Sequence, residues 1–406
     1  MIKRYHELTN RNFSMVMVWI SGGSNMDCRG KKGINQILCS LLVRGCKGFN
    51  NFQFSEYIYS HGAELNQELF EDGILISLKS LNENFNKLFP LIDLIIDKPE
   101  LSEHQFHYVK KTITNKIKKE KENPFNIVYE KWRKLVYLNH PYAFNCIGYE
   151  KDISKIIYKD ILNEYQNFKS RDKYLISNNS KINYKNEEET KKETYKENLC
   201  YPIVDLSNEY RFVNTYQISN QIILMIGNQT CSQFSNEFLP FKVLESHLAY
   251  GMSSVLFKLF REKNGLTYDV GVFNPARKDN SPFLIYLSVS NKKALLAFQL
   301  LRNLWLKLLS SPINKEEITL AKQKLKSSYL ISNQSLEDIL SRKLKLISDN
   351  LNSNYDKDYL KNIDKVNVKD ILKITDKYLS KPFLSIYGDK EICNEIKKSW
   401  VEDFEI

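Results

Sequence analysis

Arg261 and Tyr268 are two hydrogen-bonding side chains that the local pattern should bring close together. The stretch 243–271 reads as a helix, a break, a second helix that carries Arg261, and a turn into a strand that carries Tyr268. A guanidinium and a phenol at one sheet edge can donate hydrogen bonds to a common acceptor. The ordinary alternative is an arginine favoured by a helix C-terminus, followed by a strand tyrosine.

The sequence around this pair, YGMSSVLFKLFREKNGLTYDVG, resembles the second-half signature of the insulinase/pitrilysin family of zinc peptidases. That family includes mitochondrial processing peptidase. Phe260 departs from it, because the family usually has Leu there. In the family, the Arg and Tyr hold the substrate backbone beside the zinc. The resemblance therefore implies that Arg261 and Tyr268 bind substrate and stabilise the transition state.

The same resemblance directs attention to a zinc motif in the first half. Catalytic members carry H-x-x-E-H on a helix, with two His ligands and a Glu base. When Gly33 and the Arg-Gly pair after the helix are aligned with the family pattern, Gln36, Cys39 and Ser40 stand where the family has His, Glu and His. The third ligand is a Glu in a later helix, but 108–119 holds no carboxylate. We therefore expect no metal site and no zinc hydrolysis by this chain alone.

Other histidines and cysteines offer weaker candidates. His104 and His107 are spaced i,i+3 on a predicted helix, but no third ligand is evident. His247 fits a packed position on an apolar helix face, and His140 belongs to a loop with a structural role. Cys39 as a protease nucleophile would need a partner His that the sequence does not identify.

Apolar periodicity indicates the elements that position these residues. Residues 253–263 form an amphipathic helix that Ser253 or Ser254 could cap, and Gly265 ends it. In the first half, 14–20 reads as a buried strand and 33–43 as a strongly apolar helix.

The second half repeats the order of the first. PELSEHQFHYVKK from Pro99 resembles PINKEEITLAKQK from Pro312, and the IxKxxxKDIL pattern at 153–162 recurs at 363–372. The sequence therefore predicts an α+β protein of two homologous sister domains, each a mixed or antiparallel sheet covered by helices.

The predicted boundaries follow from this repeat and from a polar stretch between the copies. We expect domains at 1–178 and 201–406. Residues 179–200 carry many charges and almost nothing to bury, which predicts a flexible linker.

Composition narrows the possible environment and partners. Seven scattered cysteines without a CxxC pair favour a reducing cytoplasm over a disulfide framework. We expect neither a membrane span nor a targeting segment, because no apolar run is long enough. The net charge of +11 comes without a basic-aromatic motif, so no nucleic-acid partner is expected.

These features predict a non-catalytic subunit of a heterodimeric zinc peptidase. The resemblance implies that a zinc-bearing partner subunit supplies the metal, whereas this chain binds no cofactor and contributes Arg261 and Tyr268. The substrate would be a peptide or unfolded segment. The alternative is a proteolytically inactive structural or binding subunit of a larger complex, and the choice between homodimer and heterodimer stays open.

Overall fold

The computed structural model describes residues 2–7, 11–179, 211–267, 269–351 and 355–403. The chain forms two compact units, each built from three segments. The first unit comprises Met1–Lys119, Phe144–Glu197 and Ser332–Tyr355, and the second comprises the remaining segments Glu120–Ala143, Asn198–Ile331 and Asp356–Ile406. Residues 180–200 of the predicted linker lie outside the described residues.

The first unit contains a five-stranded mixed sheet in the order β1-β5-β2-β4-β3. Only β1 and β5 pair in parallel; the other pairs are antiparallel. The strands are β1 (Ile2–His6), β2 (Phe13–Ser21), β3 (Glu64–Leu69), β4 (Gly73–Leu81) and β5 (Lys173–Ser177).

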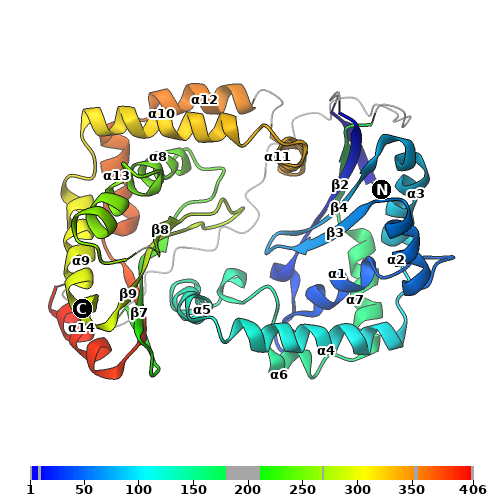
Figure 1. Ribbon diagram of the computed structural model, residues 1–406, viewed down its shortest axis with the longest axis horizontal. Coiled ribbons are helices and arrows are strands. Elements are labelled where there is room, and N and C mark those ends of the chain that lie inside the picture. The colour runs from blue at the N-terminus through cyan, green and yellow to red at the C-terminus, as the bar shows by residue number, and fades with distance from the viewer. Residues whose placement is uncertain (1, 8–10, 180–210, 268, 352–354, 404–406) are drawn as a thin grey trace. The chain divides into compact units, whose positions relative to one another are not determined.

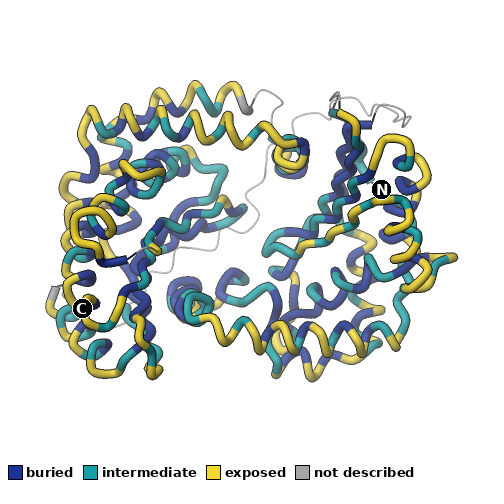
Figure 2. The backbone as a smooth tube through the Cα atoms, in the orientation of Figure 1, coloured by how far each residue is buried: buried dark blue, intermediate teal, exposed yellow. Residues whose placement is uncertain are grey.

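Helices cover one face of this sheet, where they bury the apolar side chains that alternate along β2 and β4. Figure 2 shows mostly buried residues in the inner strands β2, β4 and β5, whereas exposed residues follow the outer sides of the helices. The helices of the first half in this unit are α1 (Ile34–Leu42), α2 (Asn51–Ser60), α3 (Asn82–Asp97), α4 (Glu103–Glu120), α6 (Glu150–Ile153) and α7 (Tyr158–Ser170).

The second unit repeats the strand order as β6-β10-β7-β9-β8, again with one parallel pair, β6 and β10. This correspondence confirms the α+β fold of two sister sheets. The strands are β6 (Phe212–Tyr216), β7 (Gln221–Gln229), β8 (Asp269–Phe273), β9 (Pro282–Ser290) and β10 (Phe383–Gly388).

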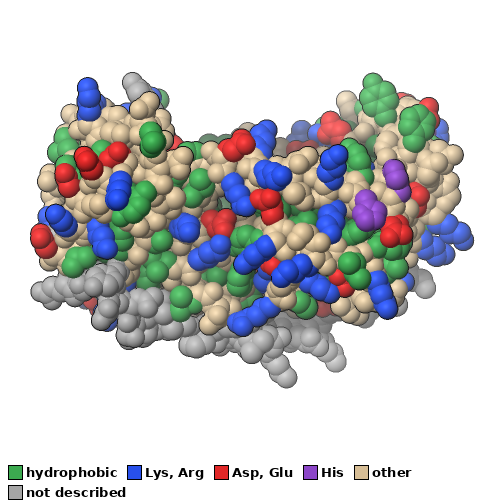
Figure 3. All heavy atoms as spheres, turned by 90° about the horizontal axis from the view of Figure 1, so that it is seen from below, with side chains coloured by type: hydrophobic (Ala, Val, Ile, Leu, Met, Phe, Trp, Pro, Cys, Tyr) green, Lys and Arg blue, Asp and Glu red, His purple; other side chains and the backbone are tan. Residues whose placement is uncertain are grey.

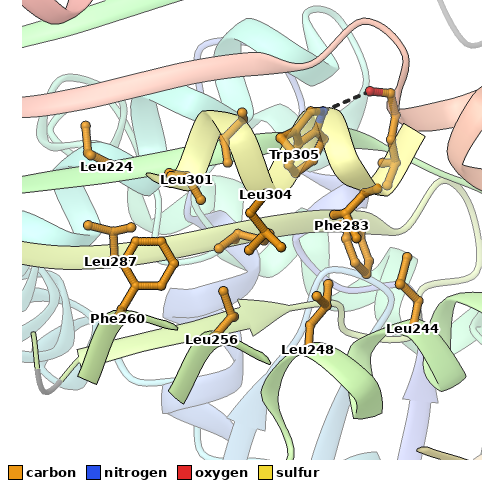
Figure 4. Packing of buried hydrophobic residues seen from close by; sticks show 14 of the residues in the cluster. Leu224, Leu244, Leu248, Leu256, Phe260, Phe283, Leu287, Leu301, Leu304 and Trp305 are labelled. Carbon is orange, nitrogen blue, oxygen red and sulfur yellow. Dashed lines mark hydrogen bonds between the residues drawn. The ribbon is translucent and has the colours of Figure 1, made fainter. Parts of the chain in front are cut away.

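The core of the second unit lies between its sheet and helices α8, α9 and α13. Figure 4 shows the indole of Trp305 among buried apolar side chains of this core. Its Nε1 donates a hydrogen bond to the Leu379 carbonyl at 3.0 Å. The helices are α8 (Phe238–Ala249), the π-helical turn η3 (Phe257–Lys263), α9 (Ala294–Ser310), α10 (Lys315–Ile331), α12 (Tyr355–Lys365), α13 (Val368–Leu379) and α14 (Lys390–Asp403).

One helix from each half of the sequence belongs to the unit formed mainly by the other half. Helix α11 (Leu336–Ser348) packs on β2 and β5 of the first unit. Its buried side chains Leu336, Leu340 and Leu344 cover the face of the sheet that is opposite to α1. The sheet residues on this face are Met15, Met17, Tyr174 and Ile176.

Helix α5 (Pro124–Tyr137) makes the corresponding contact in the second unit, on β7 and β10. The Ser385 hydroxyl donates to the Val128 carbonyl at 3.0 Å, and the Phe125 ring meets Tyr286 edge-on at 5.1 Å. Nothing in the sequence pattern indicates that these two helices exchange sheets.

Among the described residues, no helix combines the length and apolar character needed to cross a bilayer.

Candidate functional site

The three positions at which the sequence predicted a degenerate zinc motif lie on α1. Gln36 and Ser40 are half-buried, and Gln36 Nε2 donates to Ser40 Oγ at 3.3 Å. Cys39 points into the core with no exposed surface. Burial raises the pKa of its thiol to about 12, and the nearby Glu68 carboxylate adds to the shift. The helix thus presents an amide and a hydroxyl bonded to each other, together with an enclosed neutral thiol.

This donor set does not fit zinc. Zinc in catalytic sites takes imidazole, thiolate or carboxylate ligands, and neither an amide nor a hydroxyl replaces them. The Cys39 thiol points into the core, so it cannot join a metal at the exposed side of α1, and its raised pKa keeps it protonated near neutral pH, so it cannot act as a general base. Within the described parts of the chain, no group of three His, Cys, Asp or Glu side chains could hold a metal ion.

A pocket of about 370 Å³ adjoins these positions and involves α1, α2, β3 and α4. We call it the α1–α4 pocket. Its polar lining residues are Ser40, Arg44, Asn51, Ser55, Gln67 and Thr112, and its apolar lining residues are Val43, Val109 and Ile113.

The N-terminus of α1 is held by a buried carboxylate. Asp27 accepts hydrogen bonds from the backbone N–H of Gly33 at 2.6 Å and of Asn35 at 3.1 Å. Burial raises the pKa of Asp27 to about 6, although these hydrogen bonds and the Lys32 charge oppose the shift. Asp27 therefore positions the helix that carries the motif.

Arg261 lies on η3, which the core anchors. Leu256 and Phe260 are buried, as the apolar pattern predicted, and Val255 and Leu259 pack against them. Gly265 has a φ of 54°, and the Leu266 N–H donates to the Phe260 carbonyl at 2.8 Å, so the helix ends where the sequence indicated. The Arg261 side chain is exposed, and its guanidinium lies 4.9 Å from the centre of the Phe257 ring.

Tyr268 lies outside the described residues, so the pairing of Arg261 with Tyr268 stays a prediction. Its neighbours are ordered by the sheet. Thr267 is buried and accepts a hydrogen bond from the Asp269 N–H at 2.9 Å, and β8 begins at Asp269.

The histidine candidates are dispersed. His104 and His107 are exposed on α4, and His107 Nε2 lies 3.9 Å from a Glu103 carboxylate oxygen. His140 is buried in its loop, and its Nδ1 accepts from the Tyr142 N–H at 3.0 Å. Burial lowers the pKa of the half-buried His247.

Sequence reasoning missed Asp27, Arg44, Asn51 and Gln67, which surround α1 in the structure. Asp27 lies before a turn that ends at Gly33. Only the folded turn brings its carboxylate to the N-terminus of α1, so the sequence alone does not indicate this contact. The other three lie just beyond α1, on α2 and on β3, so only the folded domain brings them together.

Comparison with known proteins agrees with this architecture. Residues 5–148 match the family model described as Insulinase (Peptidase family M16), and residues 172–325 match the one described as Peptidase M16 inactive domain. An uncharacterized zinc protease of Rickettsia bellii (strain RML369-C) is 25% identical over 323 residues, which are 77% of each chain. The uncharacterized zinc protease YmxG of Bacillus subtilis (strain 168) is 20% identical over 80% of each chain.

Solved structures with the same fold include a peptidase M16 inactive domain from Pseudomonas fluorescens, with a TM-score of 0.80. It covers 96% of this chain and 95% of its own, at 18% identity. A protease from Helicobacter pylori has a TM-score of 0.82 at 18% identity and covers 95% of this chain and 96% of its own. Matches to two models of one family, one in each half, show that the chain belongs to the insulinase (M16) peptidase family and is a peptidase homologue.

Proposed function

We propose that this chain is the non-catalytic subunit of a heterodimeric zinc metallopeptidase that cleaves peptides or unfolded segments. A partner subunit with an intact zinc motif would hold the metal and the general base. Arg261 and Tyr268 of this chain would donate hydrogen bonds to the substrate backbone and to the oxyanion of the transition state.

The chemistry of α1 carries the proposal. Its motif positions hold an amide, a hydroxyl and a fully buried thiol, so this chain offers no zinc ligands there. The zinc proteases among its relatives imply a metal for the reaction, and a second subunit is the simplest source of it.

The setting of Arg261 supports its assignment to substrate binding. The Arg261 side chain is exposed, whereas Leu256 and Phe260 fix the same helical segment to the core. A charged donor on an anchored turn loses little conformational freedom when it binds a carbonyl oxygen.

The surface charge agrees with a protein or peptide partner better than with nucleic acid. Figure 3 shows many Lys and Arg side chains on one face of the molecule, with acidic side chains among them. Lys110 of α4 has a structural role, because its Nζ donates hydrogen bonds to the carbonyls of Ser154 and Ile156. The described cysteines form no disulfide with one another, which supports a cytoplasmic location.

Reconstitution tests the proposal. The purified chain should bind no stoichiometric zinc and cleave no peptide. Mixed with a zinc-motif relative from the same organism, it should restore cleavage. Arg261→Ala should lower kcat/KM about 10²-fold, because one lost oxyanion donor costs about that much, and Tyr268→Phe should also slow cleavage.

Lys258→Ala is the matched control, because it removes an exposed positive charge from the same helical turn and should leave the rate unchanged. A mixture with Arg261→Ala that cuts as fast as the wild type would contradict the role of Arg261. If the mixture never cleaves although the two chains bind each other, the alternative holds: an inactive structural or binding subunit.

A further inference from the structure

We propose that the α1–α4 pocket binds the free C-terminal carboxylate of a peptide that ends in an apolar residue. The pocket lies beside Gln36 and Ser40, where the family's catalytic members carry their zinc ligands. Here the same location offers hydrogen-bond donors and one guanidinium. Its preference is therefore for an anion, the opposite of a metal site.

Arg44 supplies the positive charge. Its Nη1 donates to Gln105 Oε1 at 3.1 Å, and its guanidinium carbon lies 4.6 Å from the centre of the Tyr108 ring. These contacts fix the plane of the guanidinium. Its Nε and Nη2 have no partner among the described residues, so two of its donors can pair with a carboxylate.

Three neutral side chains complete the donor set. The Ser40 hydroxyl accepts from Gln36 Nε2, which leaves its own proton to donate. The side-chain amides of Asn51 and Gln67 make no hydrogen bond to another described residue, so their NH₂ groups are available. The hydroxyl protons of Ser55 and Thr112 are already donated to helix carbonyls, at 2.9 and 3.0 Å.

No acidic side chain lines the pocket in the described part of the chain. Glu68 follows Gln67 on β3, but strand side chains alternate, so Glu68 is exposed on the opposite face of the sheet. A carboxylate entering the pocket would meet donors without a like charge beside it.

The apolar wall decides which kind of carboxylate fits. Val43, Val109 and Ile113 line the pocket together with these donors. A C-terminal residue carries its carboxylate and its side chain on one carbon. The carboxylate can therefore bind the donors while the side chain packs against the apolar wall. An internal Asp or Glu would bring the charge without the apolar group.

This inference extends the proposed function, since it assumes that the chain binds peptides, but its test needs no partner subunit. Fluorescence anisotropy would measure binding of the full chain to a labelled peptide that ends in Leu with a free carboxylate. Its amidated twin should bind at least about tenfold more weakly, because it lacks the charge-assisted hydrogen bonds. A third, amidated peptide with an internal Glu should bind as weakly as the twin.

Two variants locate the site. Arg44→Gln should remove most of the preference for the free acid, and Ser40→Asp should abolish binding by placing a negative charge in the pocket. Lys111→Gln is the matched control, because it removes an exposed charge from α4 outside the lining and should leave binding unchanged.

Equal binding of acid and amide by the wild type would overturn the proposal, and so would equal binding of the internal-Glu peptide. These outcomes would leave an Arg261-dependent cleavage by the reconstituted pair untouched. Conversely, Arg44-dependent binding of the free acid would stand even if no mixture of subunits cleaved a peptide.

Discussion

The Cys39 thiol is enclosed in the core of the first unit, where Ile37, Leu38 and Leu41 of the same helix are buried with it. The sequence resemblance predicts that Cys39 stands at the position of the family's general base. A base must exchange protons with bound water, and this side chain has no exposed surface. Its environment therefore makes it a packing residue.

Alkylation tests this difference in reactivity. At about pH 8, iodoacetamide should modify the exposed Cys28 but leave Cys39 unmodified, because only the thiolate reacts and the raised pKa keeps Cys39 protonated. In urea both should react. Peptide mapping by mass spectrometry gives the result, and native labelling of Cys39 at the rate of Cys28 would contradict its burial.

For individual residues, the sequence predicted the chemistry of a site wherever the residue type alone decides that chemistry. Gln36 and Ser40 cannot replace histidine ligands in any fold. The sequence could not show that Arg44 and Gln67 share a pocket, because one lies just beyond α1 and the other on β3. Sequence separation hides such neighbours until strand register is known.

Contacts at the N-terminus of helix α1 fix its position. Gly33 adopts a φ of 101° directly before the helix, and a Cβ there would lie 2.5 Å from Ile153 Cδ1 and 2.8 Å from the Ile147 carbonyl oxygen. The left-handed conformation and the close approach both require glycine. The Asp27 carboxylate accepts a hydrogen bond from the Gly33 N–H.

Two glycine substitutions separate these effects. Gly33→Ala should lower the free energy of unfolding by about 3 kcal/mol, from backbone strain plus steric overlap. Gly30→Ala is the matched control: its φ is 81°, and nothing lies within 4 Å of an added Cβ. It should cost about 1 kcal/mol. Urea unfolding measures both, and equal losses would show that the contact with Ile153 is unimportant.

Strong apolar patterns predicted the elements well. The strand expected at 14–20 and the helix expected at 33–43 both lie within a residue or two of β2 and α1. The edge strands β1 and β6 escaped prediction, because their residues are mostly half-buried and alternate weakly. Pattern reveals an element only when one side of it is clearly buried.

The exchange of α5 and α11 makes each unit depend on both halves of the chain. Without α11, the first unit would expose Met15, Met17, Tyr174 and Ile176 on the sheet face opposite α1. The periodicity of neither α5 nor α11 says which sheet the helix covers. The two halves are therefore homologous in sequence yet not independent in packing.

Separate expression tests this dependence. Fragments 1–178 and 201–406 should each fail to fold alone and should form a compact complex when co-expressed, because each supplies the helix that the other lacks. Size-exclusion chromatography and circular dichroism distinguish the cases. Leu340→Asp in the second fragment should block assembly because Leu340 is fully buried, whereas the exposed Ser341→Asp should not. A well-folded 1–178 fragment would contradict the prediction.

The reciprocal placement of α5 and α11 also bears on how a chain of this kind could arise. Both helices occupy the same place in the repeated order of elements, and each covers the sheet of the opposite copy. A half-length ancestor with its helix held away from its own sheet would have needed a second copy of itself to bury that face. Duplication would then have joined two mutually dependent protomers in one polypeptide, so that the surfaces of the two copies could diverge while each copy still completed the core of the other.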